Sequence, residues 1–164
     1  TDSVNGVTYY HRGATPTSYY DVVSVGSVKI ATPEGKNFFS NAGPGVDVYA
    51  PGEYIMSAIP AGSTVETEAG GSVDYPLNSS FKATKISGTS MAAPQVTGVV
   101  ACMLDARPEY TQTQVKAWIQ EVGTLSRLTQ SGSTYTDLAY LQGGPNRYLY
   151  QPFSSTTAWK FSGV

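Results

Sequence analysis

At residues 86–94 the sequence is Ile-Ser-Gly-Thr-Ser-Met-Ala-Ala-Pro, a run that places the hydroxyl of Ser90 between small residues. From Met91 onward, apolar side chains recur at helical spacing and continue nearly all round, which predicts a central, buried helix. Pro94 falls in the first turn, where its missing N–H costs little, and Arg107-Pro108 ends the pattern. A helix that begins near Ser90 aims free N–H groups and a positive dipole end at its surroundings.

Ser90 is a candidate nucleophile. A serine hydroxyl attacks poorly by itself and needs a base and donors that stabilise the developing oxyanion. Gly88 suits the second requirement, because glycine lets a substrate approach the backbone closely. The alternative is that Ser90 only caps the helix. The Gly-x-Ser-x-Gly elbow of the α/β-hydrolases does not fit, because Ala92 stands two positions after Ser90.

Two further blocks precede this run in the sequence. Residues 20–28 are Tyr-Asp-Val-Val-Ser-Val-Gly-Ser-Val, and residues 39–52 are Phe-Ser-Asn-Ala-Gly-Pro-Gly-Val-Asp-Val-Tyr-Ala-Pro-Gly. Together with Gly-Thr-Ser-Met-Ala-x-Pro, they resemble the subtilisin-like serine proteases (subtilases, peptidase family S8) in the order of that family. The resemblance covers most of residues 16–122 and identifies the C-terminal portion of such a catalytic domain.

The resemblance implies an α/β fold, namely the C-terminal part of a doubly wound, mostly parallel sheet with a central buried helix after the nucleophile. It implies a serine endopeptidase that hydrolyses peptide bonds of a polypeptide substrate through an acyl-enzyme on Ser90. The backbone N–H of Ser90 would contribute to the oxyanion hole. The resemblance also assigns nucleophile surroundings (Gly88, Thr89 and Met91) and a substrate pocket (Ala14, Thr15 and Thr17).

The base that this chemistry needs has no convincing candidate in the sequence. A subtilisin-type triad has the chain order Asp, His, Ser. His11 is the single histidine, and its neighbours Tyr9-Tyr10-His11-Arg12-Gly13 do not resemble the family's His-Gly-Thr motif. Asn5 follows Val4 and does not match the family's oxyanion-hole asparagine. We therefore expect an N-terminal segment of the same protease to supply the catalytic Asp and His.

Asp47 lies between two valines, so its carboxylate is expected near the core with a partner. The resemblance implies a weak cation site in which Asp47 joins the backbone carbonyls of Thr17, Tyr19 and Val22, and oxygen ligands suit Ca²⁺ or a monovalent ion. The alternative is that Asp47 accepts hydrogen bonds from nearby turn N–H groups. We expect no required cofactor, and no His or Cys cluster indicates zinc or iron.

Composition limits the classes of partner. Charged residues make up 13% of the chain and the net charge is −2, so neither nucleic acid nor an anionic membrane is an expected partner. No run of about eighteen apolar residues predicts a membrane span. The single cysteine, Cys102, excludes an internal disulfide and is expected in the core. Seventeen glycines and twelve tyrosines suit an extracellular protein or, alternatively, a virion protein.

The expected organisation has two parts. Residues 1–123 form the subtilase portion, with an inserted hairpin at about 60–85 that overhangs the site. Residues 124–164 form an aromatic-rich extension that packs on the same domain, on a partner or on further subunits. These two additions motivate a second function, a non-catalytic structural or adhesive component of a larger extracellular or virus-particle assembly.

Local patterns predict the remaining elements. Residues 1–19 are expected to form a long loop. Strands are expected at 22–28, 38–40, 46–50 and 54–57. Thr111 and Gln114 form a capping-box pattern that opens a second helix, which ends at Gly123.

Overall fold

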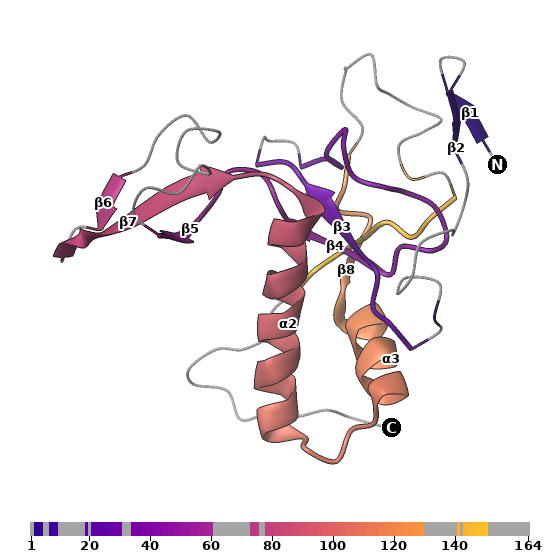
Figure 1. Cartoon of the computed structure of the whole chain (residues 1–164). Coiled ribbons are helices and arrows are strands. Elements are labelled where there is room, and N and C mark those ends of the chain that lie inside the picture. The colour runs from indigo at the N-terminus through magenta and orange to yellow at the C-terminus, as the bar shows by residue number, and fades with distance from the viewer. Residues whose placement is uncertain are drawn as a thin grey trace.

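The computed structural model describes residues 2–4, 7–9, 19, 21–30, 34–60, 73–75, 78–129, 141 and 143–150. Four strands form the main sheet in the order β3-β4-β9-β8, with β3 parallel to β4, β4 parallel to β9, and β8 antiparallel to β9. Their bounds are β3 (Val25–Val28), β4 (Val48–Pro51), β8 (Thr124–Leu125) and β9 (Arg147–Tyr148). With two helices against this mostly parallel sheet, the fold is α/β, as the sequence predicts (Figure 1).

Strands β3 and β4 lie within or next to the predicted segments 22–28 and 46–50, and three residues of β4 are fully buried. The strand predicted at 38–40 is wrong. These residues form a turn in which the N–H of Ser40 donates to the carbonyl of Asn37 at 3.0 Å. The Ser40 hydroxyl in turn accepts from the N–H of Ser27 at 2.8 Å. Because the donor of this hydrogen bond belongs to β3, no local sequence pattern predicts it.

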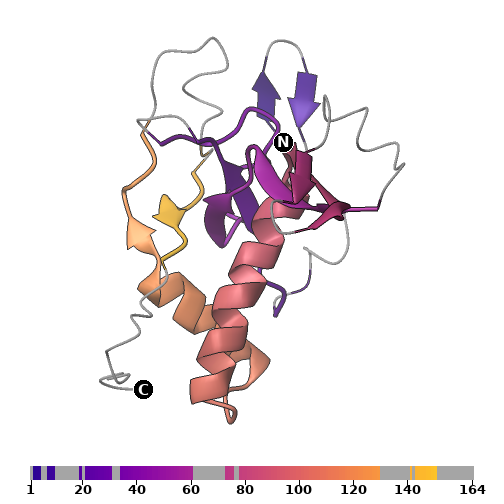
Figure 2. The same cartoon turned by 90° about the vertical axis from the view of Figure 1, so that its left-hand side faces the viewer.

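Two helices, α2 (Thr89–Ala106) and α3 (Gln112–Val122), pack beside each other on one side of the sheet (Figures 1 and 2). Helix α2 begins and ends where the sequence predicts, and the N–H of Arg107 donates to the carbonyl of Met103 at its end. The prediction that Pro94 falls in the first turn is wrong, because α2 already begins at Thr89 and Pro94 lies inside the helix. Helix α3 has the predicted capping box between Thr111 and Gln114. The core joins residues of β4, α2 and α3: Val48, Ala50, Ala92, Val96, Val99, Met103, Val115, Trp118 and Ile119.

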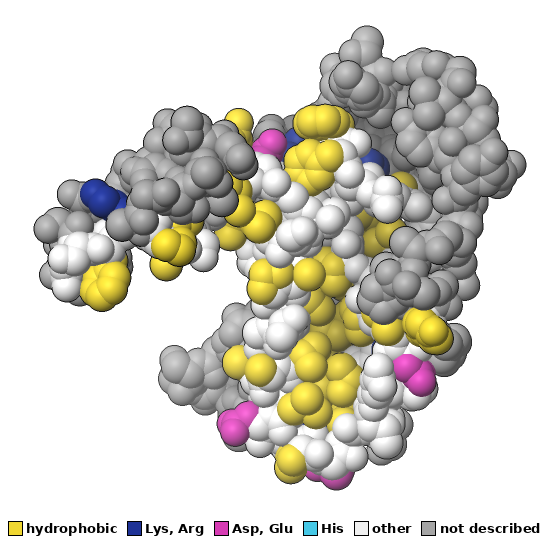
Figure 3. Space-filling model, in the orientation of Figure 1, with side chains coloured by type: hydrophobic (Ala, Val, Ile, Leu, Met, Phe, Trp, Pro, Cys, Tyr) yellow, Lys and Arg dark blue, Asp and Glu magenta, His cyan; other side chains and the backbone are white. Residues whose placement is uncertain are grey.

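Helix α2 is not buried all round, which corrects the prediction of a fully buried central helix. Among the described residues only the sheet and α3 cover it, and its other side is exposed at Ala93, Thr97, Gly98, Ala101 and Cys102. Figure 3 shows hydrophobic side chains in a band where α2 lies. The prediction that Cys102 belongs to the core is therefore wrong, because the pattern could not show which face of the helix the described residues cover.

A second sheet, in the order β5-β7-β6, projects from the rest of the molecule as an arm (Figure 1). Its strands are β5 (Ile55–Ile59), β6 (Val73–Tyr75) and β7 (Asn78–Ile86), all antiparallel to their neighbours. Strand β7 runs directly into the segment before Ser90. Strands β6 and β7 lie within or next to the hairpin predicted at about 60–85, whereas β5 precedes it and overlaps the separate strand predicted at 54–57.

The expected loop at 1–19 contains an antiparallel pair, β1 (Asp2–Val4) and β2 (Val7–Tyr9). The prediction missed a local signal, since the dipeptide Asn5-Gly6 between the two strands is typical of a tight hairpin. Neither described helix has the length and apolar character that a membrane span requires.

Candidate active site

Ser90 is the second residue of α2, and its side chain is exposed. The backbone before it is tied to the end of β4, because the N–H of Gly88 donates to the carbonyl of Gly52 at 2.8 Å. One residue earlier, the Ser87 hydroxyl accepts from the N–H of Tyr54 at 2.9 Å. One hydrogen bond donated to the segment after β4 and one donated from it therefore fix where α2 starts.

Gly52 permits this close approach. A Cβ atom built on Gly52 would lie 2.2 Å from the hydroxyl oxygen of Ser27 and 2.6 Å from the carbonyl oxygen of Gly88. Real Cβ atoms essentially never come so near to other heavy atoms. Glycine at position 52 is thus a steric requirement for placing the Ser90 helix against the sheet.

The start of α2 offers hydrogen-bond donors. Its first turn has no side-chain cap among the described contacts. The N–H of Met91 donates to the carbonyl of Gly88 at 3.0 Å. A Cβ atom on Gly88 would lie 3.7 Å from the nitrogen of Ser90. A side chain at position 88 would therefore stand beside the N–H of Ser90, and glycine leaves that space empty. Of the predicted surroundings, Gly88 and Thr89 are half-buried, as is Met91.

Ser90 lies at the carboxyl ends of the parallel strands, since Gly52 directly follows β4. This edge is where open α/β sheets generally bind ligands. The predicted pocket residues Ala14, Thr15 and Thr17 lie outside the described residues, as do Asn5 and His11, which the sequence does not favour as site residues. The described part of the chain contains no histidine.

Asp47 is buried, with 7% of its surface exposed, just before β4. Its carboxylate accepts from the N–H of Ser24 at 2.8 Å, which agrees with the alternative of hydrogen bonds from nearby backbone groups. Two side chains of α3 also reach it: Gln120 Nε2 donates at 2.7 Å and Lys116 Nζ lies at 3.1 Å. Neither contact is predicted from the sequence, although Lys116 and Gln120 are four residues apart and so lie on one face of a helix.

Of the other residues named for a cation site, Thr17 lies outside the described residues, and the carbonyls of Tyr19 and Val22 each already accept a hydrogen bond. The carbonyl of Val22 accepts from Lys116 Nζ at 2.9 Å, and the carbonyl of Tyr19 accepts from the N–H of Val22 at 3.3 Å. Within the described residues, His, Cys, Asp and Glu side chains form no group of three or more that could hold a metal ion.

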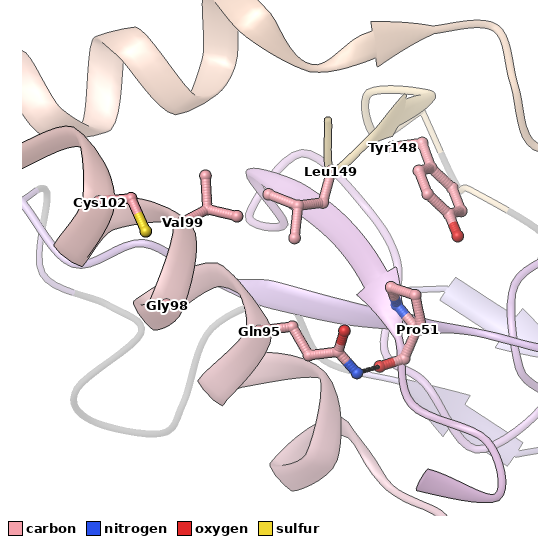
Figure 4. Close-up of a pocket in the computed structure, with 7 residues that line it drawn as sticks. All are labelled: Pro51, Gln95, Gly98, Val99, Cys102, Tyr148 and Leu149. Atoms are coloured by element: carbon pink, nitrogen blue, oxygen red, sulfur yellow. Dashed lines mark hydrogen bonds between the residues drawn. The ribbon is translucent and has the colours of Figure 1, made fainter. Parts of the chain in front are cut away.

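An apolar groove of about 390 Å³ runs between α2 and the segment after β9. Gln95 closes one end, where its Nε2 donates to the carbonyl of Pro51 at 3.0 Å (Figure 4). The sequence did not predict this groove, because β9 pairs with β4 at a single pair of residues far apart in the chain. Its lining is Pro51, Gln95, Gly98, Val99, Cys102, Tyr148 and Leu149.

Comparison with known proteins gives a consistent result. The family model of the subtilase family, Peptidase S8, matches residues 5–140. An alkaline proteinase of Hapsidospora chrysogena is 33% identical over 149 residues, which is 91% of this chain and 29% of that protein. Subtilisin-like protease 1 of Trichophyton rubrum is 32% identical over 133 residues, or 81% of this chain and 22% of that protein.

Solved structures agree with the sequence relatives. The crystal structure of a cold-adapted subtilisin-like serine proteinase superposes with a TM-score of 0.60 at 27% identity, covering 85% of this chain and 40% of that chain. The chain thus spans less than a third of the length of the two relatives named above.

Proposed function

The chain belongs to the subtilase family, and on this premise we propose that it carries the nucleophile of a serine endopeptidase that cleaves polypeptides through an acyl-enzyme on Ser90. One observation carries the proposal. The exposed hydroxyl of Ser90 stands in the uncapped first turn of α2, and the Gly88 to Gly52 hydrogen bond holds that turn at the carboxyl ends of the parallel strands.

The chemistry follows from this placement. A base removes the proton of the Ser90 hydroxyl as its oxygen bonds to the carbonyl carbon of the scissile peptide. The negative charge that develops on the carbonyl oxygen is stabilised by the N–H of Ser90 and by the positive end of α2. The leaving amine takes the proton, and water then releases the acyl group from Ser90.

The base and its orienting carboxylate come, in this proposal, from an N-terminal segment of the same protease. The substrate pocket of Ala14, Thr15 and Thr17 is likewise a proposal, as is the extracellular location. The reaction needs no metal or organic cofactor, because a serine nucleophile, a histidine base and fixed N–H donors suffice.

The test uses the full-length protein and a fluorophosphonate probe, which bonds covalently to activated serines, followed by peptide mapping. We expect the adduct on Ser90, with S90A losing the adduct and several orders of magnitude of peptidase activity. S57A is the matched control, because Ser57 is an exposed serine on the arm. S57A should label and cleave like the parent protein.

Absence of label on a folded, full-length protein would contradict the proposal. The structural or adhesive function would then become the better account, since a nucleophile site without activation performs no acyl transfer. Circular dichroism and a melting curve on the same sample establish that the protein is folded.

A further inference from the structure

The ammonium of Lys116 lies between oxygen atoms of Asp47 and Val22. Its Nζ lies 3.1 Å from Oδ2 of Asp47 and 2.9 Å from the carbonyl oxygen of Val22, so it faces two oxygens from two separate segments. Both side chains are largely buried, with exposed fractions of 16% for Lys116 and 9% for Asp47. The ammonium is therefore a fixed part of the interior.

The groups around Asp47 do not fit a metal ion. Calcium and similar hard cations need several oxygen ligands with their lone pairs free. Here the carboxylate already accepts from Ser24 N–H and Gln120 Nε2, at 2.8 Å and 2.7 Å, and the ammonium lies beside it. The backbone carbonyl of Asp47 accepts from Arg147 Nη1 at 2.9 Å. A metal ion at this place would meet N–H donors and positive charge.

We propose that the ammonium of Lys116 replaces a metal ion at Asp47, so that calcium does not bind there and this part of the fold does not depend on it. Lys116 also connects α3 to two other segments of the chain. Because Lys116 and Gln120 both belong to α3, the contact fastens that helix to the segments before β3 and β4. The proposal is independent of peptidase activity, and folded protein without activity would still test it.

The test compares melting temperatures of the full-length protein in EDTA and in calcium on the order of 10 mM, a concentration suited to weak sites. K116A removes the ammonium and opens space beside Asp47. K116M removes the ammonium but fills the space with an apolar chain of similar length. In EDTA we expect both variants to melt roughly 10 °C lower, because a buried carboxylate has lost its partner.

Calcium should then separate the two variants. K116A should gain more from calcium than the parent protein does, whereas K116M should gain only as much as the parent. K85A is the matched control, an exposed lysine on β7, and should behave like the parent in both buffers. Comparing gains removes the contribution of any calcium site elsewhere in the full-length protein.

Two results would overturn the proposal. One is an equal calcium gain in K116A and the parent protein. The other is a D47N variant of the parent that loses part of the calcium gain, because calcium would then already use Asp47. A second measurement holds even where K116A does not fold: D47N/K116M should melt higher than K116M, since it no longer buries an unpaired carboxylate, and an equal or lower value would also refute the proposal.

Discussion

Replacement of Gly52 by alanine tests whether β4 positions the nucleophile. The new methyl group would overlap the hydroxyl of Ser27 at 2.2 Å and the carbonyl of Gly88 at 2.6 Å. The serine hydroxyl can rotate away, but Gly88 is backbone, and its N–H is bonded to the carbonyl of Gly52 itself. The substitution must therefore move the segment that leads into α2.

The distance to Gly88 gives the magnitude. To reach an ordinary contact of about 3.4 Å from 2.6 Å, the carbonyl of Gly88 must move by roughly 0.8 Å. Ser90 follows two residues later in the same rigid turn, and a misplacement of about 1 Å costs on the order of 100-fold in rate. Overpacking of this kind costs about 1–3 kcal/mol, which lowers Tm by roughly 2–12 °C in a domain of about 150–250 residues.

Peptide hydrolysis and a melting curve of full-length G52A measure both effects, and G88A supplies the contrast. A Cβ on Gly88 makes only ordinary contacts, at 3.4 Å to Met91 Sδ and 3.7 Å to Ser90 N. G88A should keep its Tm but lose about 10- to 100-fold in kcat/KM, because the methyl group stands beside the oxyanion donor. A G52A protein that keeps both its Tm and its activity would refute the argument that Gly52 sets the position of Ser90.

Two further predictions concern stability. T111A should lower the free energy of unfolding by about 1 kcal/mol in urea titrations, because it removes the hydroxyl that accepts from the N–H of Gln114; an unchanged urea midpoint would show that the capping box contributes nothing. Burial, with the nearby Glu34 carboxylate, raises the pKa of Tyr148 above its ordinary value of 10.0, so above pH 10 the folded state holds a proton that the unfolded state has lost. Stability should therefore fall as pH rises from 10 to 11, and Y148F should fall less; parallel curves for the two proteins would contradict this assignment.

The parts of the fold that the sequence predicts are those whose signals are local. Arg107-Pro108 ends α2, and the pair Thr111 and Gln114 opens α3, because caps and proline effects act within one or two turns of a helix. The family motif around Ser90 likewise lies within a few residues. Its position on the helix could be stated before any tertiary contact was known.

The parts that the sequence does not predict depend on contacts between distant segments. The turn at 38–40 replaces a strand because the hydroxyl of Ser40 meets the N–H of Ser27. Cys102 lies in an apolar run but on the exposed face of α2, which periodicity alone could not distinguish when nearly every face is apolar. Lys116 contacts Asp47, which lies far from it in the sequence, and no spacing in the sequence relates those two positions.

The two ends of strand β4 carry the contacts on which the two proposals rest. At one end, Asp47 is held by α3 through Lys116, and at the other end Gly52 holds α2 through Gly88. The first three residues between them, Val48, Tyr49 and Ala50, are fully buried, so the strand fixes where both helices attach. A loss at the Asp47 end removes a contact with α3 and leaves the Gly52 to Gly88 hydrogen bond in place, so it should lower stability while the surviving folded protein stays active. A change at Gly52 moves the turn that carries Ser90, so it must lower stability and activity together.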